Sequence, residues 1–155
     1  MKQDKSTHLN YRRAIIDFIL AYISITALAF GLYLAIVAIS GEHIASTFNI
    51  RADPSYILAE KLYPILNLFV WVAFSALYFR NKQQNKKGFK REAFNLGVFW
   101  LMIALPLDLL SFVLIKNPLS LSAHDFYIGQ FPWIYLTYLV VFVSPLCYTR
   151  LVKEQ

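Results

Sequence analysis

Four long apolar runs constrain the fold of this chain more than any other feature. They cover residues 14–40, 62–79, 93–115 and 133–149. A membrane-spanning helix needs about 20 predominantly apolar residues, and each run is close to that length. The chain of 155 residues is 58% hydrophobic, and a soluble domain of this size has too little interior to bury so much apolar surface. We therefore expect lipid to cover it.

Short connections between the runs predict one all-α integral membrane domain that takes up residues 1–155. We expect an antiparallel bundle of four transmembrane helices, at about 12–40, 54–80, 92–116 and 132–150. Asp53 and Pro54 are typical of a helix N-cap followed by proline in the first turn. Gly41 is typical of a helix end, and Asn117-Pro118 should end the third helix.

Basic residues are distributed unequally between the two ends of this bundle. Three lie on one side, namely Arg51, Lys61 and Lys116. Twelve lie on the side of the termini and the middle loop: Lys2, Lys5, Arg12, Arg13, Arg80, Lys82, Lys86, Lys87, Lys90, Arg91, Arg150 and Lys153. Because cytoplasmic loops carry the excess of Lys and Arg, we expect a multi-pass protein of the cell membrane with cytoplasmic N- and C-termini. Topology accounts for the basic loop at 80–92, so no nucleic-acid partner is expected.

The N-terminal segment also has the outline of a secretory signal, with a basic start and Ala27-Leu28-Ala29 as a cleavage-like site. However, the apolar run continues through Ile39, and Asp17 interrupts the part that a signal would use. We therefore expect the first helix to be retained. Asp17 itself should form an ion pair with Arg12 or Arg13 at the membrane boundary.

Small residues on one face of the first helix predict where another helix packs. The face comprises Asp17, Ala21, Ser24, Ala27, Gly31, Ala35 and Ala38. Small residues let helix backbones approach closely in lipid, so we expect Ala27, Gly31 and Ala35 to contact a neighbouring helix. Gly97 and Ala104 should do the same on the third helix.

Asp108 is the most informative single residue, because it lies within the third apolar run. Helical rise places it about 10 Å below the external boundary. A carboxylate there costs a few kcal/mol or more unless it is paired, hydrated or protonated. Residues expected at a similar depth are Asn67, Tyr33, Tyr135, Thr137 and Tyr138. Together they predict a polar pocket in the outer half of the bundle, with His124 and Asp125 as candidates for a lid.

Each of these residues also has a purely structural interpretation. Asp108 would lock the bundle by a hydrogen bond to Asn67 or a tyrosine, without any ligand. His124 and Asp125 would form a solvated pair in a loop. Pairing of Asp108 with another protein in the membrane is a third alternative.

Motifs for chemistry are missing from the sequence. It contains no G-x-S-x-G, no H-E-x-x-H and no glycine-rich phosphate loop. His8, His43 and His124 fall in different segments, and His8 is expected on the opposite side of the membrane, so no metal site is predicted. No cofactor is expected either. Cys147 is the single cysteine and is interpreted as a packing residue.

These features favour a non-enzymatic protein that binds a lipid or a small amphipathic ligand in the outer-half pocket, in transport or as an accessory subunit. One alternative is a small intramembrane enzyme that modifies a lipid or isoprenoid with Asp108 as its acid–base group. Another is an oligomeric, proton-coupled exporter in which Asp108 titrates. The expected partners are the bilayer, such a ligand, and a second copy of the chain or another membrane protein.

Overall fold

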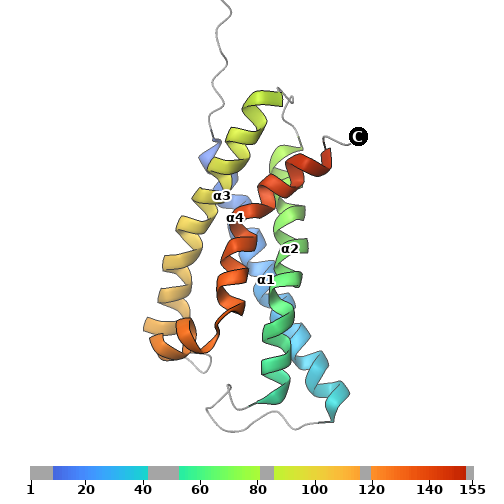
Figure 1. The fold of residues 1–155 in the computed structure, drawn as a ribbon, viewed down its shortest axis with the longest axis vertical. Coiled ribbons are helices and arrows are strands. Elements are labelled where there is room, and N and C mark those ends of the chain that lie inside the picture. Colours follow the sequence, from blue (N-terminus) through green and yellow to red (C-terminus); the bar gives the residue numbers. More distant parts are fainter. Residues whose placement is uncertain (1–8, 42–52, 81–85, 116–119, 153–155) are drawn as a thin grey trace, which may run out of the picture.

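A computed structural model describes residues 9–41, 53–80, 86–115 and 120–152 of the chain. Four long helices lie along one another and alternate in direction along the chain (Figure 1), and no strand occurs within these ranges. The helices are α1 (Tyr11–Ser40), α2 (Pro54–Phe79), α3 (Lys86–Asp108) and α4 (Trp133–Leu151), with two π-helical segments, η2 (Leu109–Leu114) and η3 (Asp125–Gly129). Four helical stretches are apolar and long enough to cross a membrane: α1, α2, α4 and the continuous stretch Gly88–Leu114 of α3 and η2. The chain is therefore an all-α, multi-pass membrane protein.

Helix ends in the first connection follow the sequence pattern. The Asp53 carboxylate accepts hydrogen bonds from the backbone N–H groups of Ser55 (2.8 Å) and Tyr56 (3.4 Å). Pro54 occupies the first helical position, where its missing N–H removes no helical hydrogen bond. Gly41 ends α1 with a φ of 68°, a left-handed conformation that glycine adopts without strain. The predicted boundaries at Gly41 and Asp53 are thus confirmed.

The third helix differs from the prediction at both ends. It begins at Lys86 rather than near residue 92, so part of the basic loop is helical. Phe89 and Ala93 are one helical turn apart and both buried, and this packing stabilises the additional turn. At the other end α3 continues as the wider turns of η2 from Leu109, shortly after Pro106, which has no N–H for the helical ladder. The predicted stop at Asn117-Pro118 lies outside the described residues.

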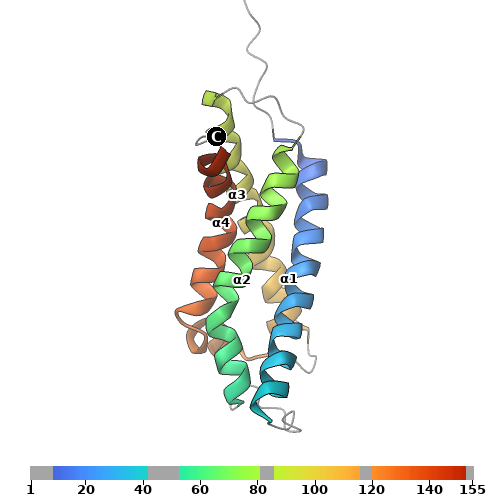
Figure 2. The same cartoon turned by 90° about the vertical axis from the view of Figure 1, so that its right-hand side faces the viewer.

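The four helices form a ring in the order α1, α2, α4, α3 (Figure 2). Adjacent helices pack extensively except on the side between α1 and α3, which share few contacts. One of these is a hydrogen bond from the Trp100 indole N–H to the carbonyl oxygen of Ala14, at 2.9 Å. Another joins Tyr22 to Asp108. The α1–α3 side is therefore the loosest part of the ring.

The half of the bundle near the chain termini is a packed aromatic core. Trp71 lies between Phe18 and Trp100, with ring centroids 5.4 and 5.2 Å away. All three side chains are buried almost completely. We call the opposite end, where α1 and η2 finish and α2 and α4 begin, the distal end, and the adjoining half of the bundle the distal half.

Polar groups near the termini also pair within the bundle, although Asp17 Oδ2 accepts no hydrogen bond from the described residues. The Tyr78 hydroxyl donates to the Glu92 carboxylate at 2.8 Å and accepts from the Asn10 backbone N–H at 3.0 Å. Arg13 and Asp17 form the expected ion pair, with 3.7 Å between Nε and Oδ2. This prediction is confirmed.

The small-residue face predicted for α1 is wrong over most of its length. Ala27, Gly31 and Ala35 are exposed on the bundle surface. A Cβ atom placed on Gly31 would have no atom of another element within 4 Å. By contrast, Gly97 and Ala104 of α3 are buried, and a Cβ at Gly97 would collide with the backbone of α4.

The face that α1 does bury contains larger side chains, including Ile25, Tyr33 and Val37. It follows a four-residue spacing from Ala21 onward, and each such step rotates around the helix by about 40°. The sequence projection assumed one constant face, whereas a helix that crosses its neighbour at an angle presents a rotating one. In the distal half the small residue at the contact is Ala59 of α2, against which Tyr33 and Val37 pack.

Candidate functional site

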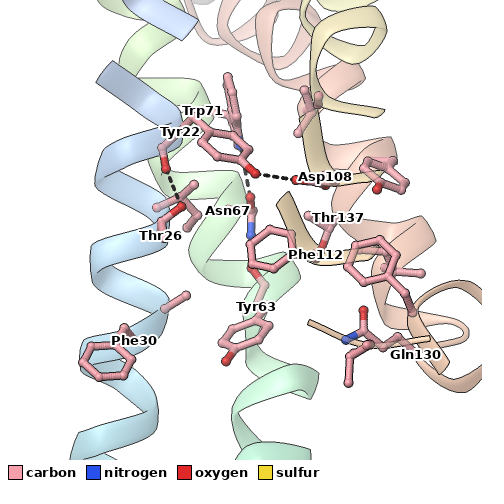
Figure 3. A pocket seen from close by; sticks show the side chains of 18 of the residues that line it. Tyr22, Thr26, Phe30, Tyr63, Asn67, Trp71, Asp108, Phe112, Gln130 and Thr137 are labelled. Atoms are coloured by element: carbon pink, nitrogen blue, oxygen red, sulfur yellow. Dashed lines mark hydrogen bonds between the residues drawn. The ribbon is translucent and has the colours of Figure 1, made fainter. Parts of the chain in front are cut away.

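A cavity of about 240 Å³ lies in the distal half of the bundle, between the α1–α2 pair and the α3–α4 pair (Figure 3). Most of its wall is apolar. Nine of the described lining residues are aromatic: Tyr22, Phe30, Tyr33, Tyr56, Tyr63, Trp71, Phe112, Phe126 and Tyr138. The polar remainder comprises Thr26, Asn67, Asp108, Gln130 and Thr137. An apolar cavity with a few convergent polar groups is typical of a small-molecule site.

Asp108 lies at the level of Tyr22 and Trp71, farther from the distal end than Tyr63 and Gln130 (Figure 3). The Tyr22 hydroxyl donates a hydrogen bond to Asp108 Oδ1 at 2.6 Å. This bond links α1 to the end of α3 across the loosest side of the ring. The predicted inward orientation of Asp108 is thus observed, and its partner is Tyr22, a tyrosine that was not among the residues expected at the same depth.

Tyr138 of α4 lies on another side of Asp108. Its hydroxyl is close enough to interact with the carboxylate but is outside hydrogen-bond geometry. The side chain is only 8% exposed, and its oxygen has no hydrogen-bond partner within the described part of the chain. A buried hydroxyl without a partner costs about 1–3 kcal/mol. The cavity therefore has, beside its carboxylate, a buried hydroxyl that forms no hydrogen bond within the described part of the chain.

Asn67 lines the cavity but does not contact Asp108 as expected. Its amide nitrogen donates to the carbonyl of Tyr63 at 2.9 Å, and its amide oxygen accepts from the Trp71 indole N–H at 3.0 Å. Both groups are thus engaged within α2. Asn67 holds the Trp71 ring in place at the cavity wall. Of the two partners predicted for Asp108, Asn67 or a tyrosine, the structure shows the tyrosine.

Polar contacts also organise the part of the cavity nearest the distal end. The Tyr33 hydroxyl donates to Asp53 Oδ2 at 2.6 Å, which ties α1 to the start of α2. The Gln130 amide donates to the Tyr56 hydroxyl at 3.0 Å, which ties the segment before α4 to α2. The Tyr56 ring stands edge-on to Tyr33 and Tyr63, with centroids 6.4 and 6.5 Å away. These side chains are therefore held by contacts with one another at the distal end of the cavity.

Thr137 lines the cavity, as predicted. Its hydroxyl donates a hydrogen bond to the Trp133 carbonyl of its own helix at 3.1 Å. Tyr135 does not line the cavity. It is exposed and packs against Phe131, with ring centroids 5.8 Å apart. On α4, Tyr135 and Tyr138 are three residues apart, and only Tyr138 turns toward Asp108.

His124 and Asp125 form the solvated loop pair of the structural interpretation and do not form the alternative, a lid over the cavity. The His124 side chain is 76% exposed, and its Nδ1 lies 3.7 Å from Asp125 Oδ1. Asp125 accepts a hydrogen bond from the Ser122 hydroxyl at 2.7 Å, which caps the short helical turn locally. The same segment closes the cavity with Phe126 and Gln130 instead.

Several lining residues were not predicted from the sequence, notably Tyr22, Phe112 and Phe126. Phe112 and Phe126 stack at a centroid distance of 6.0 Å and join η2 to η3. In the sequence these two residues appear only as aromatic residues near the membrane boundary. Aromatic residues at that depth are equally typical of interfacial belts, so they did not indicate a cavity. Tyr22 carried a clearer signal, as a hydroxyl in the middle of an apolar run.

No protein-family model, no curated protein and no solved structure matches this chain. Across the described ranges, no three His, Cys, Asp or Glu side chains gather as ligands for a metal ion.

Proposed function

We propose that this protein binds a small amphipathic molecule in the distal cavity. The polar group of the ligand would lie at Asp108 and Tyr138, and its apolar part among the aromatic side chains. One observation carries the proposal: a mainly apolar cavity holds one buried carboxylate and, beside it, a buried hydroxyl that has no partner in the described structure. A ligand with one polar group would satisfy both.

Access from the bilayer supports a lipid-soluble ligand. Thr26 and Phe30 of α1 line the cavity and are also exposed, Phe30 to 55%. The cavity therefore reaches the surface beside α1. Phe30 is ten residues from the distal end of α1, so this opening lies about 15 Å along the helix from that end. A molecule dissolved in lipid would enter sideways without crossing the polar boundary.

A purely structural role for Asp108 accounts for less of the geometry. The hydrogen bond with Tyr22 would stabilise the bundle on its own. It does not account for a cavity beside the carboxylate or for the unpartnered hydroxyl of Tyr138. The enzymatic alternative with His124 assisting Asp108 is disfavoured, because His124 is exposed and outside the cavity lining. A binding site of this kind suits a transport protein or an accessory subunit that holds its ligand.

A cavity-filling variant tests the proposal. Thr137→Phe places a ring in the cavity, whereas Leu139→Phe changes an exposed position on the same helix. Each variant and the wild-type protein are purified in a mild detergent, and the small molecules that co-purify are identified by mass spectrometry. We expect one species enriched at least tenfold over bulk lipid in the wild type and in Leu139→Phe, and lost from Thr137→Phe.

Two results would contradict this function. One is a wild-type protein that retains no species above the bulk lipid background. The other is a Thr137→Phe protein that elutes as a single folded species and still retains the wild-type molecule. Size-exclusion elution of both variants controls for misfolding.

A further inference from the structure

We infer that the ligand is a lipophilic cation, an organic amine or quaternary ammonium whose charged nitrogen lies beside Asp108. This inference rests on the proposed binding function and specifies the chemical class of its ligand. Three features of the cavity carry it: its one carboxyl group, the aromatic character of its wall and its size.

The cavity contains one carboxyl group and no basic side chain among its described lining residues. Asp108 is the acid, and none of the described lining residues is Lys, Arg or His. Tyr22 gives the carboxylate one hydrogen bond but no opposite charge. An anionic group here would meet a like charge, whereas a cation would provide the pairing that a carboxylate within lipid needs.

The wall beside Asp108 suits a cation that carries apolar substituents. Tyr22 and Trp71 lie at the level of Asp108 (Figure 3), and Tyr138 also lines the cavity near the carboxylate. The faces of aromatic rings attract cations, and such cages recognise quaternary ammonium groups that cannot donate hydrogen bonds. A neutral sugar or amide would instead need several directional hydrogen bonds. In this wall Asn67 already uses one amide N–H and one acceptor position of its oxygen within α2.

The size of the cavity favours a compact head group. Its volume of about 240 Å³ falls below the roughly 300–1,000 Å³ that is typical of sites for drug-sized ligands. A whole phospholipid would not fit inside. A small cationic head group fits, and an attached apolar chain would extend past Phe30 into lipid.

Three probes of matched size test the inference. They are benzyltrimethylammonium, its neutral carbon isostere neopentylbenzene, and the anion phenylmethanesulfonate. The full-length protein is reconstituted in nanodiscs of phosphatidylcholine, and binding is measured by equilibrium dialysis against empty nanodiscs. We expect saturable binding of the cation, binding of the isostere at least tenfold weaker, and no saturable binding of the anion.

A carboxylate variant and a matched control identify the group responsible. Asp108→Asn keeps the size and hydrogen bonding of the side chain but removes its charge, so it should weaken cation binding at least tenfold and leave the isostere unchanged. Asp17→Asn removes a buried carboxylate that pairs with Arg13 outside the cavity, and should leave both affinities unchanged. The wild-type comparison of cation and isostere is decisive even if Asp108→Asn does not fold.

The outcomes separate this inference from the proposed function. If the isostere or the anion binds as tightly as the cation, the ligand class is wrong while the cavity still binds small molecules. If no probe binds saturably, the ligand class is also wrong. The retention experiment with Thr137→Phe then shows separately whether the cavity holds another molecule.

Discussion

Substitution of two glycines by alanine gives opposite predicted effects on stability, and the contrast follows directly from the packing of α1 and α3. Gly97 lies on α3 where it contacts α4. A Cβ atom at this position would collide with the carbonyl oxygen of Phe142 and lie 3.1 Å from the carbonyl carbon. Both are backbone atoms, so no side-chain rotation can relieve the clash and the two helices must separate. At Gly31, no atom of another element lies within 4 Å of the same Cβ.

The magnitudes can be estimated from two opposing contributions. Alanine favours a helix interior over glycine by about 1 kcal/mol. Overpacking a tight interface costs about 1–3 kcal/mol, and a rigid backbone contact lies toward the upper end of that range. Gly97→Ala should therefore lower the free energy of unfolding by about 1–2 kcal/mol. Gly31→Ala should raise it by up to about 1 kcal/mol, because only the helix propensity changes.

Thermal unfolding of the detergent-solubilised protein, followed by size-exclusion chromatography after heating, measures both effects. For a chain of this length, 1 kcal/mol corresponds to about 2–4 °C in Tm. We expect Gly97→Ala to melt about 2–8 °C below the wild type, and Gly31→Ala to melt at or slightly above it. If Gly31→Ala lowered Tm as much as Gly97→Ala, the small-residue face of α1 would be a packing surface and the orientation of α1 described above would be wrong.

Two further predictions concern topology and the α1–α3 contact near the termini. Reporter fusions after Gln155 and within 80–92 should report a cytoplasmic location, and fusions within 41–53 and 117–130 an external one; an external C-terminus would refute the orientation. Trp100→Phe removes the indole hydrogen bond to the α1 backbone and should lower the stability by about 1 kcal/mol, seen as a lower Tm; an unchanged Tm would mean that the bond contributes nothing to the bundle.

The sequence predicted the number of helices and most of their ends for simple physical reasons. Bilayer thickness sets the length of an apolar run, and local hydrogen bonding sets the caps at Asp53 and Gly41. The inward orientation of Asp108 also followed from one strong cost, the exposure of a carboxylate to lipid. Each of these features depends on a single segment and its surroundings, not on which other helix lies nearby.

Features that depend on two helices were predicted poorly. Hydropathy shows that a helix spans the membrane, but a uniformly apolar helix such as α1 contains little information about which side faces protein. The small residues Ala27, Gly31 and Ala35 suggested a face, yet the same residues are tolerated against lipid. Because α1 crosses its neighbour at an angle, the residues it buries toward its distal end are larger ones such as Tyr33. The start of α3 at Lys86 was not predicted for a similar reason. Its buried side depends on a contact with another helix, in which Phe89 packs against Phe79 with ring centroids 4.5 Å apart.

Tyr22 was not predicted as the partner of Asp108 because the depth of each residue in the membrane was counted from the distal ends of the helices. Tyr22 is 18 residues from the distal end of α1, which corresponds to about 27 Å along the helix and seems far below Asp108. The other end of the bundle provides a better reference, because Tyr11 and Phe99 pack with ring centroids 5.4 Å apart. From that contact Tyr22 is eleven residues along α1 and Asp108 nine along α3, or about 16 and 14 Å. The two side chains thus meet because the helices share a register near the termini, while their distal ends extend to different lengths.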